Sequence, residues 1–437
     1  MAQGPPGSPG RAEINKIIGD VSTMAARAKK DILFLCHLFY PEHHTAANLS
    51  FDTARYMASH GFSVDALVGY PWEYTQDRHV PLVEMVEGVG IRRIRYLQID
   101  RKRKLGRLIN FFSFTFGVLL HSAQFRKYRV IVVYSNPPVL PVAAILAKRK
   151  YGTKYVFVAH DIYPEVAYAS KSLTPKSVVS RLMNWINRRL YRSADCVIAM
   201  TDEMKAYLLA HRPQLSADRV VTIENWAHER PATAEPGAYT RFGYKDGQFI
   251  VSFFGNMGTC QDVEVIMEAA ELLKQDDRVR FLIAGYGNKK DAVEARIRER
   301  GLHNVQLMNY LTGEAFEQAM AISACSIVSL ERGLMGMCAP SKYYTCLHGG
   351  QAILAIVEKG SYLNLEVEKE RIGYTVEIGD GRGLRDAILK MAESPAECAR
   401  MGQRAKKLYE ERYNYAQAMG KYCAVITDKC GIAKESS

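Results

Sequence analysis

Residues 155–165, YVFVAHDIYPE, show in one stretch how this chain is built. An apolar segment with β-branched residues runs into a histidine and an aspartate, and Pro164 with Glu165 then signals the first turn of a helix. A buried strand does not readily enclose an imidazole or a carboxylate, so His160 and Asp161 belong where the strand ends. The stretch predicts a strand, a polar turn and a helix.

The same alternation extends outward in both directions from this stretch. Apolar segments and segments of helical periodicity take turns along the chain, and strands that alternate with helices predict α/β architecture with parallel sheets covered by helices. The strands expected before residue 230 are 31–39, 62–70, 128–135, 155–160 and 195–201, with helices at 48–61, 141–152 and 183–194. The strands expected after it are 249–255, 279–287, 305–311 and 325–330, with helices at 263–274, 289–301 and 313–324.

The length of 437 residues predicts two domains, because single cores rarely grow this large. A polar stretch with two prolines and several glycines separates the two series and predicts a linker. The C-terminal helix could pack on either domain. We therefore expect a disordered lead or tag (1–30), an N-terminal Rossmann-like domain (31–227), a hinge (228–248), a C-terminal Rossmann-like domain (249–415) and a terminal helix with a tail (416–437).

The formal net charge of +12 predicts an anionic partner. No base-stacking module or DNA-binding motif accompanies the charge, which disfavours nucleic acid and leaves an anionic bilayer or phosphorylated small molecules. The nine cysteines form no C-x-x-C pair, so we expect reduced thiols, a cytosolic compartment and no structural zinc. The N-terminus has no apolar core typical of a secretory signal, and the longest uncharged apolar run, 108–120, is too short to span a bilayer.

Candidate site residues lie where the predicted strands end, because ligands of open parallel sheets bind beyond the carboxyl ends of their strands. At the first such place, two interpretations of His160-Asp161 remain open. In one, Asp161 caps the following helix and His160 hydrogen-bonds locally. In the other, His160 lies in a cleft between the domains and contacts a bound substrate.

A second candidate is GNMGTCQD (255–262), directly after a predicted strand. Its glycines allow a ligand to approach the backbone, and Thr259 with Asp262 resembles a capping box that opens the next helix. Free N–H groups at a helix N-terminus bind anions, so the turn either holds a phosphate or is a plain tight turn. It is neither G-x-G-x-x-G nor a P-loop, so it does not support NAD or P-loop chemistry.

Two further segments carry candidate residues. In CAPSKYYTCLHGGQAIL (338–354), Ser341 is placed to cap a helix and Lys342 either adds a cation to an anion site or lies on the surface. In TIENWAH (222–228), Asn225 and Trp226 lie where the hinge meets the cleft, and the tryptophan is expected to fill the joint between the domains.

A basic and aromatic segment, residues 92–120, suggests contact with a membrane. A basic cluster at 101–104 precedes LINFFSFTFGVLL, and each basic residue near an anionic leaflet contributes about 1 kcal/mol. Aromatic side chains of an amphipathic segment insert at the interface. The alternative is a solvated charged loop followed by a core helix.

Taken together, these segments resemble the family 4 glycosyltransferases of the GT-B fold, from about residue 31 onward. The resemblance is closest to bacterial enzymes that build surface polysaccharides on lipid carriers, such as fucosamine transferases. It is carried by FYPEHHTAANLS (39–50), SNPPVLPVAA (135–144), AHDIYPEVA (159–167), ENWAH (224–228), FFGNMG (253–258) and APSKYYTCLHGG (339–350).

The resemblance implies retaining, metal-independent transfer from a nucleotide-diphospho sugar, with a UDP-sugar favoured, to a lipid-linked saccharide at the cytoplasmic face of the membrane. It makes His160 and Lys342 the catalytic residues. It also implies two sets of binding residues. Those for the diphosphate and nucleotide are Gly255, Asn256, Met257, Gly258, Ser341 and Lys342, to which we add Glu331 as a candidate. Those for the acceptor and sugar are Tyr40, Glu42, His43, His44, Thr45, Asp161 and Asn225.

Three departures from the family pattern concern the donor. The first loop usually carries Gly-Gly where this chain has Ala46-Ala47, and no Lys or Arg follows the glycine turn. The glutamate that normally binds the nucleotide ribose is replaced by Thr345, for which Glu331 is a possible substitute. Two alternatives therefore remain: a catalytically weak binding or scaffolding subunit, and a UDP-sugar epimerase. The sequence names neither the sugar, the base, the acceptor nor the oligomeric state.

Overall fold

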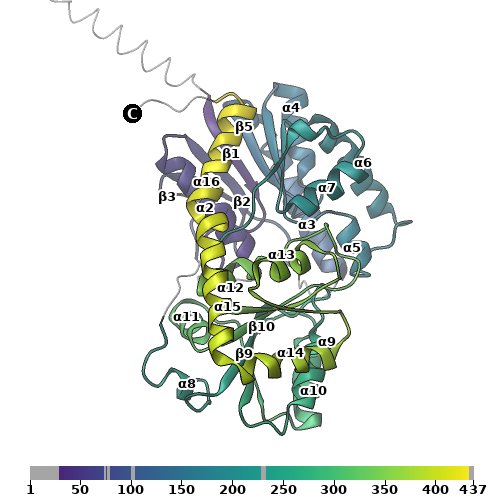
Figure 1. Ribbon diagram of the computed structural model, residues 1–437. Coiled ribbons are helices and arrows are strands. Elements are labelled where there is room, and N and C mark those ends of the chain that lie inside the picture. The colour runs from purple at the N-terminus through teal and green to yellow at the C-terminus, as the bar shows by residue number, and fades with distance from the viewer. Residues whose placement is uncertain (1–28, 73–74, 76–78, 100–103, 228–232, 433–437) are drawn as a thin grey trace, which may run out of the picture.

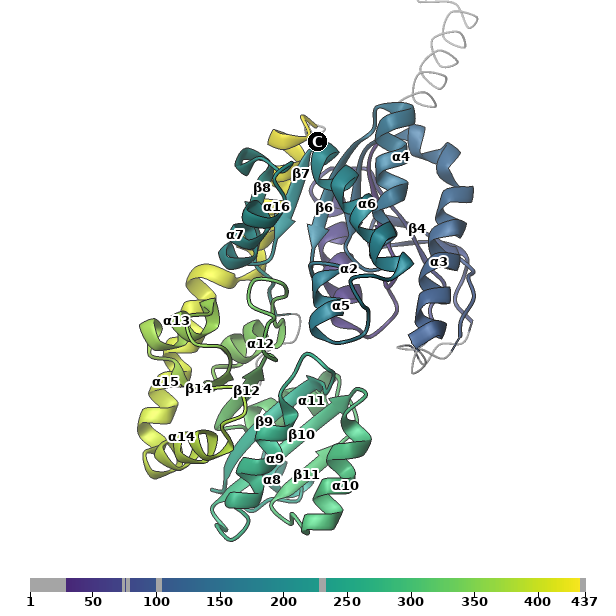
Figure 2. The same cartoon turned by 90° about the vertical axis from the view of Figure 1, so that its right-hand side faces the viewer.

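The computed structural model describes residues 29–72, 75, 79–99, 104–227 and 233–432. The expected lead, 1–30, lies outside the described residues except for its last two positions. The second of these, Lys30, already belongs to the first strand. Two sheets, each with its own helices, form two Rossmann-like domains that face each other across a cleft (Figures 1 and 2).

The first domain is built on an eight-stranded sheet with the order β3-β4-β2-β1-β5-β6-β7-β8. Its central strands are buried because each is a short run of apolar, largely β-branched residues, whereas the edge strand β3 is largely exposed. The strands are β1 (Lys30–Cys36), β2 (Val64–Gly69), β3 (Val83–Val86), β4 (Val89–Ile94), β5 (Tyr128–Tyr134), β6 (Lys154–Ala159), β7 (Cys196–Ala199) and β8 (Val220–Thr222).

One edge of this sheet departs from the expected parallel arrangement. Strand β3 pairs antiparallel with β4, while β4 itself is parallel to β2. The two-residue turn between them has positive φ at both positions, 47° at Glu87 and 81° at Gly88, as a tight hairpin turn requires. The hairpin was missed because its strands are short and only half-buried.

The second domain is built on a six-stranded, entirely parallel sheet with the order β11-β10-β9-β12-β13-β14. Its strands are β9 (Phe249–Asn256), β10 (Val279–Tyr286), β11 (Val305–Met308), β12 (Cys325–Ser329), β13 (Ala352–Ile356) and β14 (Gly373–Val376).

The helices of the first domain are α2 (Thr45–Ser59), α3 (Lys104–Leu120), α4 (Pro141–Tyr151), α5 (Glu165–Ala169), α6 (Val178–Ser193) and α7 (Asp202–His211), with short 3₁₀ turns at Ser122–Lys127 and Ala217–Arg219. Those that follow are α8 (Ala238–Arg241), α9 (Val263–Leu272), α10 (Lys290–Arg300), α11 (Gly313–Ala321), α12 (Lys342–Gly349), α13 (Tyr362–Glu370), α14 (Gly381–Glu393), α15 (Pro395–Leu408) and α16 (Tyr415–Ala424), with π-helical stretches at Tyr409–Tyr413 and Val425–Lys429. None of the helices in the described part of the chain combines the length and the apolar character that crossing a bilayer would need.

The C-terminal segment returns to the first domain, as Figure 1 shows for the yellow helices. Helix α15 packs on the second sheet, whereas α16 packs on α2 and buries its apolar residues in the first core. The hydroxyl of Tyr415 donates to the carbonyl of Asp52 (3.2 Å), and Lys421 pairs with Glu224 (2.6 Å). The expected terminal helix therefore packs back on the N-terminal domain.

The expected hinge, 228–248, is only partly a linker. Residues 228–232 lie outside the described part of the chain, but the remainder contains α8 and joins the second domain. Phe242 and Tyr244 are buried against Ile250 and Leu282, and the Tyr244 hydroxyl donates to the carbonyl of Phe281. These aromatic residues pack the segment onto the second domain. The prolines and glycines in its sequence had led us to predict a linker instead.

The two domains also touch directly along one side of the cleft. The amide of Ile162 donates to the carbonyl of Met337 (2.8 Å). The carboxylate of Glu203, on α7, accepts from the amides of Gly336 (2.9 Å) and Tyr362 (3.0 Å) in the second domain. Glu203 thus holds both a loop and the first turn of α13.

Candidate active site

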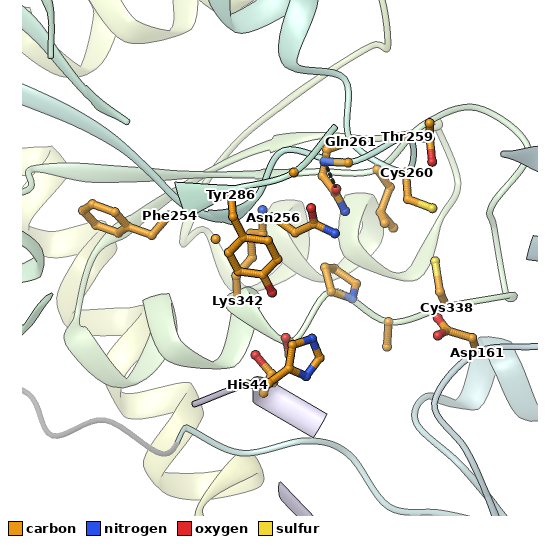
Figure 3. A pocket seen from close by; sticks show the side chains of 18 of the residues that line it. His44, Asp161, Phe254, Asn256, Thr259, Cys260, Gln261, Tyr286, Cys338 and Lys342 are labelled. Atoms are coloured by element: carbon orange, nitrogen blue, oxygen red, sulfur yellow. Dashed lines mark hydrogen bonds between the residues drawn. The ribbon is translucent and has the colours of Figure 1, made fainter. Parts of the chain in front are cut away.

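A cleft of about 1260 Å³ lies between the domains, at the carboxyl ends of strands from both sheets (Figure 3). The first domain contributes residues from α2, α3 and the segment after β6, and the second contributes the turns after β9 and β10 and the start of α12. Of the predicted site residues, the cleft is lined by His44, Thr45, Asp161, Gly255, Asn256, Gly258, Ser341 and Lys342.

The glycine turn follows β9 and lies close against the end of β10. A Cβ on Gly285 would lie 1.8 Å from the carbonyl oxygen of Gly255, and one on Gly287 would lie 2.4 Å from that of Met257. Gly255 itself has φ of +111°, which favours glycine. The close approach of these two backbones is therefore possible only because glycine occupies these positions.

Two of the N–H groups that we expected to bind a diphosphate are already engaged. The amide of Met257 donates to the carbonyl of Tyr286 (2.6 Å), and that of Gly258 donates to Oε1 of Gln261 (3.2 Å). The first bond is part of the backbone framework. The second is to a side chain, which an anion could displace without changing the fold.

The prediction that Thr259 and Asp262 form a capping box is wrong. Helix α9 begins at Val263, and Asp262 is its N-cap, with Oδ1 accepting from the amide of Val265 (3.3 Å). The other oxygen of Asp262 accepts from the amide of Gly379 (2.9 Å). Residue 259 lies too far from the first helical turn to cap it, and Asp262 instead fixes the back of the turn.

Lys342, the first residue of α12, lies under the glycine turn with its ammonium group buried. Its Nζ has no hydrogen-bond partner among the described residues and lies 3.8 Å from the centroid of the Phe253 ring. Its Cε lies 4.0 Å from the position of a Cβ on Gly255. Burial lowers the pKa of Lys342 to about 7. An anion in the cleft would supply the missing partner.

Ser341 precedes Lys342 at the N-cap position of α12, but it does not cap the helix as expected. Its backbone is already helical and its hydroxyl makes no capping hydrogen bond. A capping serine needs an extended backbone to turn its oxygen toward the helix amides, and Ser341 lacks that conformation. The hydroxyl lines the cleft instead.

Two titratable residues predicted for the site, His44 and Asp161, line the first-domain wall of the cleft, opposite Lys342. His44 is the N-cap of α2 and its Nδ1 accepts from the amide of Ala46 (3.1 Å). Asp161 does not cap α5, whose N-cap position is Pro164. Burial raises the pKa of Asp161 to about 6, and the residue faces the cleft close to Cys338 (Figure 3).

His160 is not among the residues that line the cleft. Its ring packs edge-on against Tyr134, with 5.1 Å between the ring centroids. Burial lowers the pKa of His160 to about 4, so the imidazole is neutral at pH 7. Its catalytic role stays a prediction, and the structure places it one residue from a lining group.

Four predicted acceptor residues also lie outside the lining of the cleft. Glu42 is buried and accepts from the amide of Trp72 (3.2 Å), so it supports the loop before α2. Tyr40 is exposed and packs on Phe51, and His43 is exposed. Asn225 is buried, one residue before Trp226, which lines the cleft and donates from Nε1 to Asp52.

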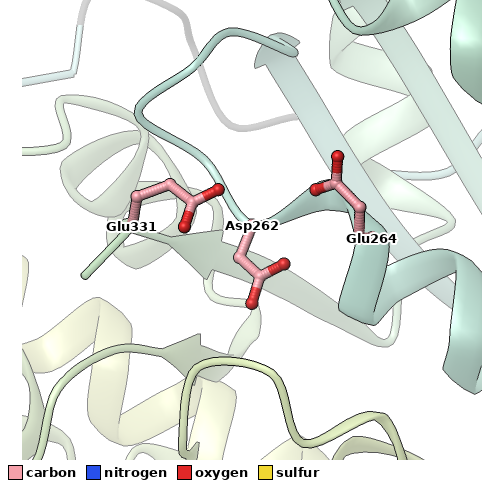
Figure 4. A group of neighbouring side chains, drawn as sticks. All are labelled: Asp262, Glu264 and Glu331. Carbon is pink, nitrogen blue, oxygen red and sulfur yellow. The ribbon is translucent and has the colours of Figure 1, made fainter. Parts of the chain in front are cut away.

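Glu331, predicted to substitute for the missing glutamate, belongs to an acidic group behind the turn (Figure 4). Oxygens of Asp262, Glu264 and Glu331 lie within 4.8 Å of one another. Lys289 offsets this charge, because its Nζ pairs with Glu331 (2.9 Å) and Glu264 (3.0 Å) and donates to the carbonyl of Gln261 (2.7 Å). Glu331 does not line the cleft, and it steadies the turn through Lys289.

Several lining residues were missed from the sequence. Arg107, in the first half of α3, brings a cation to the first-domain wall, and Tyr286 ends β10 and stacks edge-on with Tyr310 (5.3 Å). Tyr286 could have been predicted as a site residue, because it ends a predicted parallel strand. Arg107 could not be found in this way, since it lies within a helix far away in sequence.

Two family models match the chain, one in each domain. The glycosyl transferase 4-like domain matches residues 50–226, and the glycosyl transferases group 1 domain matches residues 240–408. These matches meet at the hinge and place the two halves of the cleft in two glycosyltransferase domains.

Relatives and solved structures agree with this assignment. The chain is 26% identical to a probable glycosyltransferase, WbjE, of Pseudomonas aeruginosa, over 72% of this chain and 78% of the relative. It is 26% identical to WcaI of Escherichia coli, a putative colanic acid biosynthesis glycosyl transferase, over 57% of this chain and 63% of the relative. The fold matches sucrose-phosphate synthase of Thermosynechococcus elongatus with a TM-score of 0.71 at 14% identity, covering 91% of this chain and 98% of that one.

A second solved structure has the same fold. WaaG, a glycosyltransferase of lipopolysaccharide biosynthesis, matches with a TM-score of 0.67 at 13% identity, covering 91% of this chain and all of that one. The fold and the cleft are those of a GT-B glycosyltransferase. The chain belongs to the glycosyltransferases that combine a 4-like and a group 1 domain, consistent with family 4.

Proposed function

We propose that this glycosyltransferase moves a sugar from a UDP-sugar to a lipid-linked saccharide, with retention of anomeric configuration and without a divalent metal. The observation that carries the proposal is the buried, unpartnered Nζ of Lys342 under the glycine turn. A buried ammonium group without a partner is costly for the free protein. An anionic leaving group bound there would supply the missing charge.

Lys342 and the glycine turn would act on the diphosphate. Breaking the anomeric C–O bond develops negative charge on the leaving diphosphate, and a positioned cation stabilises that charge most when water is excluded. The Gly258 amide becomes available when Gln261 is displaced. The donor base and ribose would lie toward Tyr286 and Thr345, which line the same half of the cleft.

The UDP preference is supported by a structural neighbour. The HepE protein of Anabaena, whose fold matches with a TM-score of 0.65 at 16% identity over 91% of this chain and 99% of that one, was solved with UDP-glucose. The resemblance to retaining enzymes supports attack by the acceptor hydroxyl on the face that the diphosphate leaves. The acceptor would then approach from the first-domain wall, where Arg107, Asp161 and Tyr163 lie.

A lipid-linked acceptor is supported by the outer face of α3. Leu105, Phe112, Phe116 and Leu120 are spaced seven, four and four residues apart and are exposed, so one side of the helix offers apolar side chains. The same helix carries Arg107 into the cleft. A membrane contact at α3 would hold the protein at the cytoplasmic face of the membrane, with the cleft open to a lipid-borne sugar.

The basic part of the proposed membrane segment is smaller than the sequence suggested. Arg93 lies in β4, is buried and pairs with Glu84 (2.5 Å), so it cannot reach a lipid surface. Residues 100–103 lie outside the described part of the chain. The described residues of 92–120 therefore offer exposed apolar side chains on α3 and three exposed arginines, Arg92, Arg95 and Arg107.

The test is a transfer assay with labelled UDP-, GDP- and ADP-sugars and a polyprenyl-diphosphate-linked monosaccharide, with and without EDTA. We expect turnover with a UDP-sugar that EDTA does not abolish, and a product whose anomeric configuration, read by NMR, matches the donor. His160→Ala should lower kcat about 100-fold or more, in the range of a lost catalytic group. His60→Ala, an exposed histidine at the end of α2, is the matched control.

Each other result points to a different activity. Loss of turnover with EDTA would exclude the metal-independent mechanism. Interconversion of the donor sugar without acceptor would indicate an epimerase. Binding of UDP without turnover of any donor would indicate a binding or scaffolding subunit.

A further inference from the structure

Helix α6 exposes a second apolar face that the transfer reaction does not use. Val178, Leu182 and Trp185 are 78%, 37% and 40% exposed, and their spacing of four and three residues places them on one side of the helix. The opposite side is buried, with Met183, Ile186 and Leu190 facing the protein. An exposed tryptophan between two exposed aliphatic residues is unusual on a surface that faces water alone.

The charge around this face has a single sign. Helix α6 contains Arg181, Arg188, Arg189 and Arg192 and no acidic residue. Among the described residues none of these arginines has an ion-pair partner, and the guanidinium carbon of Arg189 lies 3.7 Å from the centroid of the Trp185 ring. The face therefore combines apolar side chains with unneutralised cations, the pairing that suits anionic headgroups above acyl chains.

The buried side of α6 contacts α3. Ile186 of α6 packs with Phe111 of α3 and Val139 in one small buried cluster. Figure 2 shows the two helices on neighbouring parts of the first domain, on either side of α4. Helices α6 and α3 thus share a buried contact, and both expose apolar side chains on the first domain.

We infer that the outer face of α6, formed by Val178, Leu182, Trp185 and the four arginines, docks on an anionic lipid bilayer. A second copy of the chain is a poorer occupant. A symmetric contact between two such faces would bring eight arginines together without an acid to separate them. Lipid phosphates supply the complementary charge, and Trp185 lies at the depth where tryptophan is favoured, between headgroups and chains.

The test reads Trp185 directly. In a Trp72→Phe background, the remaining tryptophans are the exposed Trp185 and the buried Trp226. We expect a blue shift of the emission with vesicles of phosphatidylglycerol and phosphatidylcholine, little shift with phosphatidylcholine alone, and reversal by high salt. Trp185→Phe in the same background should abolish the shift.

A matched pair of leucine variants then measures vesicle sedimentation. Leu182→Glu should weaken binding to the anionic vesicles about tenfold, since it replaces an inserting apolar side chain by a carboxylate, which the negatively charged lipid repels. Leu272→Glu, on α9 of the second domain and 43% exposed, should leave binding unchanged. Far-UV circular dichroism checks that both variants are folded.

Three results would overturn the inference: no blue shift with anionic vesicles, equal vesicle binding by Leu182→Glu and Leu272→Glu, or a dimer in light scattering that Leu182→Glu converts to a monomer. None of these readouts depends on sugar transfer. The proposed function and the docking of α6 can therefore fail separately.

Discussion

At the scale of single residues, the site depends on a lysine that the free protein leaves without a partner. Lys342 is held between Phe253 and the glycine turn, where its ammonium group is buried. Its pKa of about 7 means that protonation is sensitive to what occupies the cleft. A bound diphosphate would raise that pKa again, because a nearby anion favours the charged form.

The substitution Lys342→Met tests how much the buried, unpartnered ammonium group destabilises the ligand-free protein. The pKa of Lys342 is lower in the folded state than in the unfolded chain, so between pH 7 and pH 10.5 the unfolded chain binds more protons, and the ligand-free protein gains stability as pH rises. We expect Lys342→Met to flatten this dependence and to raise the free energy of unfolding at pH 7 to 8 by about 1–3 kcal/mol. Thermal unfolding across this pH range is the measurement.

A lysine with partners is the control for that variant. Lys289→Met removes two ion pairs behind the turn and should lower the melting temperature. UDP should stabilise the wild type and the Lys289 variant more than Lys342→Met. A Lys342→Met protein that is less stable than the wild type at every pH would contradict the assigned environment.

At the scale of elements, the glycine turn is shaped by the strands beside it rather than by a helix. The turn lies between the end of β10 and the start of α12, and Asp262 and Lys289 fix it from behind. Gly285 allows β9 and β10 to meet with almost no space between their backbones. The geometry of the turn is thus a property of the strand pair.

Gly285→Ala should therefore disturb the turn. A Cβ there would overlap the carbonyl oxygen of Gly255, so the strands must separate. We expect a loss of about 2 kcal/mol or more in the free energy of unfolding, typical of overpacking in a core. Urea titration of the variant, read by fluorescence and circular dichroism, measures it.

The matched variant Gly420→Ala has the opposite expected sign. Gly420 lies in α16, and a Cβ there would meet nothing within 4 Å. Alanine should stabilise that helix by about 0.5–1 kcal/mol. Equal effects of the two substitutions would show that the contact between β9 and β10 is less tight than described.

At the scale of the whole molecule, the contacts between the domains define the width of the cleft. The carboxylate of Glu203 accepts two amides from the second domain, and Ile162 donates to Met337 beside it. When two such domains close, they exclude water from the reacting sugar. Water would otherwise hydrolyse the donor. Glu203 is placed to hold the two domains in the arrangement that the structure shows.

Glu203→Ala should loosen this arrangement. The amides of Gly336 and Tyr362 lose their acceptor, and hydrogen bonds to a charged group contribute about 1.5–3 kcal/mol. We expect hydrogen exchange at both amides to speed up about tenfold or more. Hydrogen–deuterium exchange mass spectrometry of peptides covering 336 and 362 reports the change.

The neighbouring Asp202→Ala is the control, because Asp202 accepts from Thr222 within the first domain. It should leave exchange at both peptides unchanged. Unchanged exchange in Glu203→Ala would show that the domains are held together without this carboxylate.

The sequence by itself determined the two α/β domains, the strand ends where the site lies, and the turn and lysine that line the cleft. These follow from local rules: apolar strands are buried, glycines permit close backbones, and parallel strands end at one edge. Strand β6 and the turn after β9 were predicted almost to the residue. The β3–β4 hairpin and α8 were not, because a half-buried strand and a four-residue helix leave little periodicity.

Only the tertiary structure decided which of these polar residues meet. It joined Asp161 and Lys342 in one cleft, added Arg107 from a helix, and directed His160 toward Tyr134. It also placed Glu331 on Lys289, behind the turn. The physical reason is that a side chain's partners come from elements distant in sequence, so burial, charge and pKa at each position are set by how the two sheets and the returning C-terminal helix pack.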